Sequence, residues 1–213
     1  NKKFLVTAGP TYERIDPVRF IGNYSSGKMG YALAEELADR GAEVILVTGP
    51  VSLSTRNRSI TILRVESARQ MYDTCVNYFP SCDGAVMAAA VADFTPDKIE
   101  VKKKKRGDEN FSLDLVPTED IAAELGRIRR TGQVLVGFAL ETSDEIKNAK
   151  EKLIRKNLNF IVLNSLNDEG AGFGTDTNKI TIIGQNNNSE AFELKSKRDV
   201  AADIVEKMIS IIG

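Results

Sequence analysis

The sequence has 213 residues, a hydrophobic share of 42%, and 29 basic side chains against 30 acidic ones. This length predicts one domain, spanning residues 1–213, with a full hydrophobic core. The near balance of charge favours neither nucleic acid nor a membrane surface as a partner. The chain contains no histidine, which excludes Ser-His and Cys-His catalysis and histidine-ligated metals within it. No apolar run approaches membrane-spanning length and no signal-peptide pattern is present, so we expect a cytoplasmic protein.

Strand-like apolar runs alternate with helical patterns along the chain. The predicted strands are residues 4–6, 43–48, 61–65, 84–89, 134–139, 160–163 and 179–183, and the predicted helices are residues 27–40, 68–78, 120–129, 144–156 and a last one from about Arg198. This alternation predicts an α/β fold: a Rossmann-like, doubly wound, mainly parallel sheet with helices on both faces. Ligands of such sheets bind at the carboxyl ends of the strands, where residues 7–9, 48–50 and 88–90 fall.

One segment breaks the alternation. Residues 99–115 have period-two polarity on each side of a Gly107-Asp108 turn, which predicts a β-hairpin flap over about residues 95–116 that projects from the sheet. The flap carries the cationic run Lys102–Arg106. Such a run is often a solvated surface, but on a mobile flap it also suits closure over a triphosphate, where lysines offset charge on a pyrophosphate leaving group.

A glycine- and serine-rich segment opens the first predicted helix. Residues 22–28 match the first seven positions of the P-loop pattern, but Met29 stands where a Ser or Thr would hold magnesium, so we reject a P-loop. The backbone N–H groups at the start of this helix can still hold phosphate, because they lack partners within the helix. Gly27 and Gly30 would allow a close approach of a ligand or a strand to the backbone.

A run of small side chains and a carboxylate follows the predicted strand at residues 84–89. In residues 88–94, Ala-Ala-Ala-Val-Ala-Asp-Phe, the alanines leave room for a ligand, and Asp93 could bind a substrate polar group or a hydrated magnesium ion. The alternative is that the alanines pack against a helix and Asp93 caps it.

Six blocks of the sequence, taken in order, closely resemble the phosphopantothenoylcysteine synthetase family, the phosphopantothenate-cysteine ligases of coenzyme A biosynthesis. The blocks are Thr7–Arg19, Asn23–Gly30, Ala89–Phe94, Pro117–Ile121, Gly137–Thr142 and Lys152–Asn157, and they span nearly the whole chain.

The resemblance implies a two-step ligation. The carboxylate of 4'-phosphopantothenate attacks the α-phosphate of CTP and releases pyrophosphate, and the amine of L-cysteine then attacks the acyl-cytidylate. It also implies Mg²⁺ with the CTP, a homodimer and, in many bacteria, fusion to a flavin-dependent phosphopantothenoylcysteine decarboxylase, so a trimmed piece of such a fusion is plausible.

Site residues follow from the same resemblance. Catalysis is assigned to Asn23 and to a flap lysine, which is Lys103 if counted from Asp93 and near Lys102 if counted back from the Gly107 turn. The substrate-binding residues are Arg19, which reaches a neighbouring subunit, Asn23, Ala89, Ala90 and Asp93. The nucleotide-binding residues are Gly9, Ser25, Gly27, Gly30, Ala88, Ala89, Asp93, Glu119, Asp120, Ile121, Ala122, Phe138, Lys152, Lys156 and Asn164.

Two other functions are compatible with a Rossmann-like sheet. An NAD(P)-dependent reductase would require Gly-x-Gly-x-x-Gly after the first strand and an acidic residue ending the second, and the chain has neither. A noncatalytic nucleotide-sensing module would bind CTP without releasing pyrophosphate, and it would not need the basic flap beside Asp93.

Overall fold

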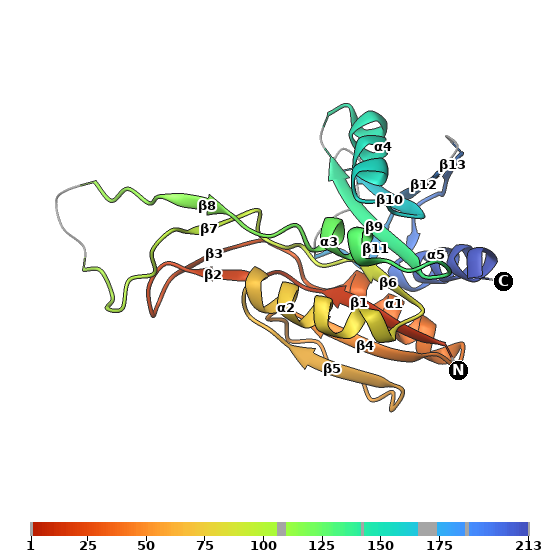
Figure 1. The fold of residues 1–213 in the computed structure, drawn as a ribbon, viewed down its shortest axis with the longest axis horizontal. Coiled ribbons are helices and arrows are strands. Elements are labelled where there is room, and N and C mark those ends of the chain that lie inside the picture. Colours follow the sequence, from red (N-terminus) through yellow and green to blue (C-terminus); the bar gives the residue numbers. More distant parts are fainter. Residues whose placement is uncertain (1, 106–109, 142, 166–173, 186–187, 213) are drawn as a thin grey trace.

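The computed structural model describes residues 2–105, 110–141, 143–165, 174–185 and 188–212 (Figure 1). Its centre is an eight-stranded sheet with the strand order β13-β12-β10-β9-β6-β1-β4-β5. The six strands from β10 to β5 are parallel, and β12 and β13 continue the sheet antiparallel. The bounds are β1 Lys3–Ala8, β4 Glu43–Thr48, β5 Ile60–Arg64, β6 Gly84–Met87, β9 Val134–Glu141, β10 Phe160–Ser165, β12 Ile180–Gly184 and β13 Ser189–Ala191. The predicted Rossmann-like, mainly parallel sheet is confirmed.

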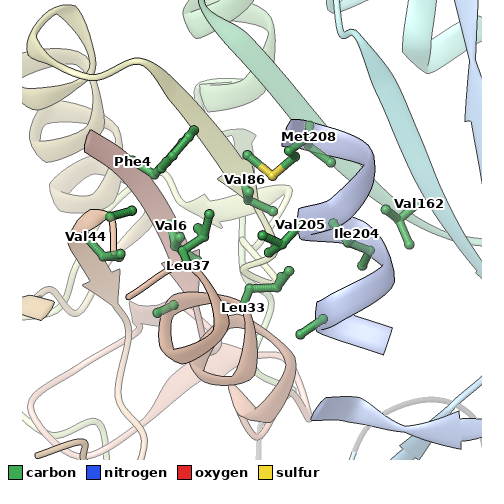
Figure 2. Close-up of a cluster of buried hydrophobic side chains, with 14 of the residues drawn as sticks. Phe4, Val6, Leu33, Leu37, Val44, Val86, Val162, Ile204, Val205 and Met208 are labelled. Carbon is green, nitrogen blue, oxygen red and sulfur yellow. The ribbon is translucent and has the colours of Figure 1, made fainter. Parts of the chain in front are cut away.

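Helices cover both faces of this sheet. The helices are α1 Lys28–Asp39, α2 Ala68–Tyr78, α3 Ile121–Ile128, α4 Glu145–Arg155 and α5 Lys197–Ile212, with a short 3-10 turn at Phe79–Ser81. On one face, α1 and α5 pack against the central strands, and Figure 2 shows Leu33 and Leu37 of α1 near Val205 of α5, with Met208 near Val86. The helices α2, α3 and α4 bury a second apolar cluster on the opposite face. Because helices cover both faces of the sheet at β1 and β6, the sequences of these strands are nearly continuous apolar runs.

Helices α2 and α3 begin where a side chain satisfies one of their first N–H groups. Ser67 and Gln70 form a capping box at the start of α2, and the Asp120 side chain accepts a hydrogen bond from the Ala123 N–H at the start of α3. The start of α1 differs, because its N-cap is Gly27, with φ +78°, and no side chain caps it. The first N–H groups of α1 therefore remain available to a ligand.

Two pairs of short strands project together from the sheet (Figure 1). The strands β2 Tyr12–Arg14 and β3 Phe20–Gly22 form a hairpin, which we call the first arm, and β7 Phe94–Pro96 pairs with β8 Leu115–Pro117 in the flap. The first arm was not predicted. Its Tyr12 and Phe20 rings stack with centroids 3.8 Å apart, and β2 packs on β7. A further small pair, β11 Thr177–Asn178 and β14 Lys195–Ser196, lies beside the start of α5.

The flap projects from the sheet as predicted, but its strands are much shorter than predicted. Strand pairing lies at the base of the flap, and residues 97–105 and 110–114 contain no strand. The Gly107-Asp108 turn and Arg106 lie outside the described residues. The period-two pattern was misleading because adjacent lysines disfavour cross-strand pairing.

Candidate functional site

A cleft lies at the carboxyl ends of β1, β6, β9 and β10, the edge where the sequence places ligands. It consists of two adjoining cavities that share Ala89, Ala90, Phe138 and Leu140 in their walls. The larger cavity, of about 500 Å³, also has walls from α3 and α4, and the smaller one, of about 170 Å³, ends at the start of α1. A cleft of this kind can hold an elongated ligand, with one end near the start of α1 and the other near the start of α3.

Most predicted site residues come together in this cleft. The larger cavity is lined by Asn23, Ala89, Ala90, Asp93, Glu119, Asp120, Ile121, Ala122, Phe138, Lys152 and Lys156. The smaller cavity is lined by Ser25, Gly27, Gly30, Ala88, Ala89, Ala90, Phe138 and Asn164. Blocks far apart in the sequence therefore meet at one edge of the sheet.

Four predicted residues do not line either cavity. Gly9 lies in the turn after β1 with a positive φ of +76°, and a Cβ added at Gly27 would lie 3.3 Å from its backbone nitrogen. Arg19 lies in the turn of the first arm, and Lys102 and Lys103 are exposed on the flap. These three cations are carried by segments that project away from the sheet, which sequence spacing alone does not reveal (Figure 1).

The start of α1 gives one end of the cleft a chemistry that is suited to anions. Backbone N–H groups of Lys28, Met29 and Gly30 begin the helix without a side-chain cap, at the positive end of its dipole. Gly30 has a second, structural reason to be glycine: a Cβ there would lie 2.5 Å from the Cβ of Ala8. Helix α1 therefore packs directly on β1, which fixes the N–H groups at the strand end.

Two lysines of the cleft that sequence analysis did not identify are held by the segment at residues 174–176. The Nζ of Lys28 lies 2.7 Å from Oδ1 of Asp176, and the Nζ of Lys197 donates to the Thr175 carbonyl oxygen at 2.6 Å. Burial lowers the pKa of Lys197, and the neighbouring Lys28 lowers it further. Lys28 could have been found from its place after Ser-Ser-Gly, but Lys197 comes from the start of α5, where no motif marks it.

The lysines at the other end of the cleft are each paired with a carboxylate. The Nζ of Lys152 lies 2.6 Å from Oε1 of Glu141, and the Nζ of Lys156 lies 2.9 Å from Oδ1 of Asp120, the N-cap of α3. The cleft is therefore rich in lysine side chains whose charges are neutralised by carboxylates of the same chain. An anionic ligand can displace these carboxylates as the partner of each lysine.

The segment after β6 is rigidly held and is not helical. The Ala89 N–H donates to Oγ1 of Thr7 at 3.1 Å, the Ala90 N–H donates to the Gly9 carbonyl oxygen at 2.9 Å, and the Ala92 N–H donates to Oγ1 of Thr11 at 2.9 Å. Strand β6 ends at Met87, two residues earlier than predicted, so Ala88 and Ala89 belong to this turn. Asp93 precedes β7 and caps no helix, which excludes the alternative drawn from the sequence.

The carboxylate of Asp93 is free in the cleft. It makes no hydrogen bond or ion pair within the part of the chain that the structure describes. The described residues also contain no group of three or more acidic or cysteine side chains arranged to hold a metal. Mg²⁺ is commonly held by one or two carboxylates together with substrate phosphates, and Asp93 is suited to that role.

In the described parts of the chain, no helix combines the length and the apolar character needed to span a membrane.

Comparison with known proteins identifies the family. The domain family described as "DNA/pantothenate metabolism flavoprotein C-terminal domain" matches residues 1–212. The bifunctional coenzyme A biosynthesis protein CoaBC of Bacillus subtilis is 43% identical over 210 residues, which cover 99% of this chain and 52% of that protein. A protein of an unidentified prokaryote named cysteine/cysteine sulfinic acid decarboxylase is 56% identical over 211 residues, covering 99% of this chain and 59% of that protein.

A solved structure agrees with this assignment. The crystal structure of the C-terminal domain of a CoaBC protein matches with a TM-score of 0.82 and 38% identity, over 98% of this chain and 94% of that one. The chain thus spans somewhat more than half the length of these curated relatives and nearly all of the solved C-terminal domain. It belongs to the DNA/pantothenate metabolism flavoprotein C-terminal domain family.

Proposed function

We propose that this chain is a ligase of coenzyme A biosynthesis, which joins 4'-phosphopantothenate to L-cysteine with CTP through an acyl-cytidylate. The observation that carries the proposal is the cleft itself, which brings Asn23, the Ala88–Ala90 turn and the start of α1 together at the strand ends. The similarity to proteins named CoaBC, over nearly the full length of their C-terminal domain structure, supports it.

The cations of the cleft suit a triphosphate substrate. The α1 N–H groups and Lys28 attract phosphate at one end, and Lys152 and Lys156 do so at the other. In the first step, a carboxylate oxygen of phosphopantothenate forms a bond to the α-phosphorus, and the bond from that phosphorus to the bridging oxygen breaks. Pyrophosphate leaves with the electron pair, and lysines stabilise its added charge.

The second step requires an oxyanion donor that does not titrate. The cysteine amine attacks the acyl carbonyl, the carbon–nitrogen bond forms, and CMP leaves as the carbon–oxygen bond breaks, while the amine proton passes to solvent. The Asn23 carboxamide keeps one hydrogen on the Ala90 carbonyl oxygen, at 2.8 Å, and has a second for the developing oxyanion. A neutral amide suits a chain without histidine.

Mg²⁺ would accompany the nucleotide, with Asp93 supplying a carboxylate to it, and would neutralise phosphate charge.

A second copy of the chain would complete the site. The candidate cations Arg19, Lys102 and Lys103 are carried by the first arm and the flap, which project from the sheet (Figure 1). The same projecting segments expose large apolar side chains, among them Val18, Phe20, Phe94, Ile99 and Val101. A surface of this kind favours burial against another protein, and a homodimer would bring arm residues to a partner's cleft.

The relative named as a decarboxylase does not favour that activity for this chain, because the match covers 59% of its length. The name describes the whole protein. The test is product formation: we expect phosphopantothenoylcysteine, CMP and pyrophosphate from CTP, phosphopantothenate and cysteine with Mg²⁺, detected by mass spectrometry. Folded protein that binds CTP but forms none of the three products would favour the sensing module instead.

A further inference from the structure

The turn of the first arm contains a carboxylate that is completely shielded from solvent, and the cleft does not use it. The side chain of Asp16 has 0% exposure, although it lies in a slender projection rather than in the core. Buried carboxylates are uncommon unless they are paired and hydrogen-bonded, so the partners of Asp16 are informative.

The two oxygens of Asp16 have different partners. Oδ1 accepts hydrogen bonds from the N–H groups of Val18, at 2.8 Å, and Arg19, at 2.9 Å, and so closes the turn of the first arm. Oδ2 accepts from the Arg19 guanidinium, through Nε at 3.0 Å and through an amino nitrogen, and from the Lys104 N–H at 3.3 Å. One oxygen thus folds the arm, and the other joins it to the flap.

Arg19 completes a ring of contacts with the same flap residue. Its guanidinium donates to the Lys104 carbonyl oxygen at 3.0 Å while it holds Asp16. Lys104 is therefore fixed through both its N–H and its carbonyl group. The hydrogen bonds from Arg19 hold the pKa of Asp16 far below its usual range; desolvation opposes this shift, and three backbone N–H groups add to it. The carboxylate is therefore charged at neutral pH.

A second anchor lies four residues earlier in the flap. The Glu100 N–H donates to the Ile15 carbonyl oxygen at 2.9 Å. The two anchor points, Glu100 and Lys104, bracket Lys102 and Lys103, whose side chains are exposed. The backbone of the two candidate catalytic lysines is therefore held at both ends by the first arm.

We infer that Asp16 is a positioning residue, which docks residues 100–104 of the flap on the first arm and so sets Lys102 and Lys103 in place together with Arg19. The inference rests on the proposed function for its catalytic consequence but not for the docking. A short two-stranded ribbon is marginal in water, so the flap needs such an external anchor to present its lysines in one geometry.

Asp16→Asn tests the docking selectively. In this variant the asparagine oxygen can still accept from the N–H groups of Val18 and Arg19, so the turn can persist. Its amide nitrogen then takes the place of Oδ2 and faces the donors of Arg19 and Lys104, so the contact with the flap is lost. Asp83→Asn is the matched control. Asp83 also accepts hydrogen bonds from a backbone N–H, that of Lys3, and from a charged side chain, Lys2 Nζ, and it lies far from the arm. Lys104→Pro is a second variant, for the exchange measurement: it removes the Lys104 N–H together with the lysine side chain, restricts the Lys103 backbone, and leaves Asp16 in its turn.

Hydrogen exchange by mass spectrometry, on a peptide covering residues 98–105, reads the docking without any activity. We expect faster exchange in Asp16→Asn and Lys104→Pro, and wild-type exchange in Asp83→Asn. In parallel, the kcat of pyrophosphate release should fall by about 10- to 100-fold, because the lysines are displaced rather than removed. The KM for CTP should be unchanged.

Each outcome is decisive. Unchanged exchange in both Asp16→Asn and Lys104→Pro would overturn the docking. Faster exchange with wild-type kcat would overturn the positioning role, as would a loss confined to KM. If the wild-type protein releases no pyrophosphate, the proposed function fails, and the exchange comparison alone decides whether Asp16 docks the flap.

Discussion

The carboxamide nitrogen of Asn23 lies 2.8 Å from the carbonyl oxygen of Ala90, to which it donates a hydrogen bond. This contact joins the segment that follows the first arm to the turn that follows β6, so it holds the Asn23 side chain over the strand ends. One amide hydrogen is thereby used to fix the orientation of the group. The other can serve a reacting oxygen.

Asn23→Ala should accumulate the acyl-cytidylate, because the oxyanion of the second step loses its donor while the first step keeps its cations. We expect the rate of phosphopantothenoylcysteine formation to fall by about 10²- to 10³-fold. Acid-quenched samples analysed by mass spectrometry would detect the intermediate. Asn57→Ala, outside the cleft, should behave as the wild type, and normal turnover in Asn23→Ala would refute the assigned role.

Lys103→Gln should block formation of the acyl-cytidylate, because the leaving pyrophosphate would lack a cation. Lys102→Gln, its neighbour on the flap, is the comparison that decides the register. The measurement is pyrophosphate release without cysteine. A larger loss in Lys102→Gln would transfer the role to that lysine, and full activity in both variants would remove the flap from the chemistry.

Asp176→Asn should tighten CTP binding, because it frees Lys28 beside the start of α1. Asp176 is highly exposed, so the expected gain is modest, about two- to fivefold in Kd. Calorimetry with CTP and Mg²⁺, without phosphopantothenate, would measure it. Asp73→Asn on α2 removes another exposed acid that pairs with a basic side chain, away from the cleft, and should leave Kd unchanged. Weaker binding in Asp176→Asn would mean that Lys28 needs this partner to face the ligand.

Gly30→Ala should destabilise the fold by about 1–3 kcal/mol, the usual cost of overpacking. The added Cβ would lie 2.5 Å from the Cβ of Ala8 and 2.8 Å from the Thr7 carbonyl oxygen, so α1 would have to move from β1. Urea unfolding measures the change. Gly184→Ala is the matched control, since the nearest atom to its Cβ is 3.9 Å away. Equal stability of the two variants would disprove the close packing.

Asp83 should contribute a pH-dependent part of the stability. Its hydrogen bond from the Lys3 N–H, reinforced by Lys2, lowers the pKa of Asp83 in the folded state. The contribution is therefore present above the unfolded-state pKa of about 3.9 and is lost as pH falls through the lower folded-state value. Urea midpoints of the wild type and Asp83→Asn should differ most at pH 5–8 and converge in acid. A constant difference down to pH 3 would contradict this.

Elements dictated by local pattern could be predicted from the sequence. Strand β4, Glu43–Thr48, and helix α2, Ala68–Tyr78, have the predicted bounds, because a continuous apolar run and a capping serine are local signals. The first arm could not be predicted. Its strands have three residues each, and they are held by stacking of Tyr12 on Phe20 and by packing against the flap, which are long-range contacts.

The same distinction applies to the site. Asp93 follows from its place after the predicted strand at residues 84–89 and Asn23 from the family resemblance, and the structure brings both to the larger cavity. Lys197 could not be found, because its place depends on how α5 returns to the sheet. The buried state of Asp16 could not be predicted either, since its sequence neighbours Pro17 and Val18 are exposed and its contacts include the backbone of the docked flap.

The most direct test of the proposed chemistry is a reaction with CTP, 4'-phosphopantothenate and Mg²⁺ from which cysteine is omitted, analysed for pyrophosphate and for protein-bound products. We predict about one pyrophosphate per active site and a phosphopantothenoyl cytidylate that is converted to phosphopantothenoylcysteine and CMP when cysteine is added. Absence of pyrophosphate until cysteine is present, or release without an acyl-cytidylate, would contradict the two-step account.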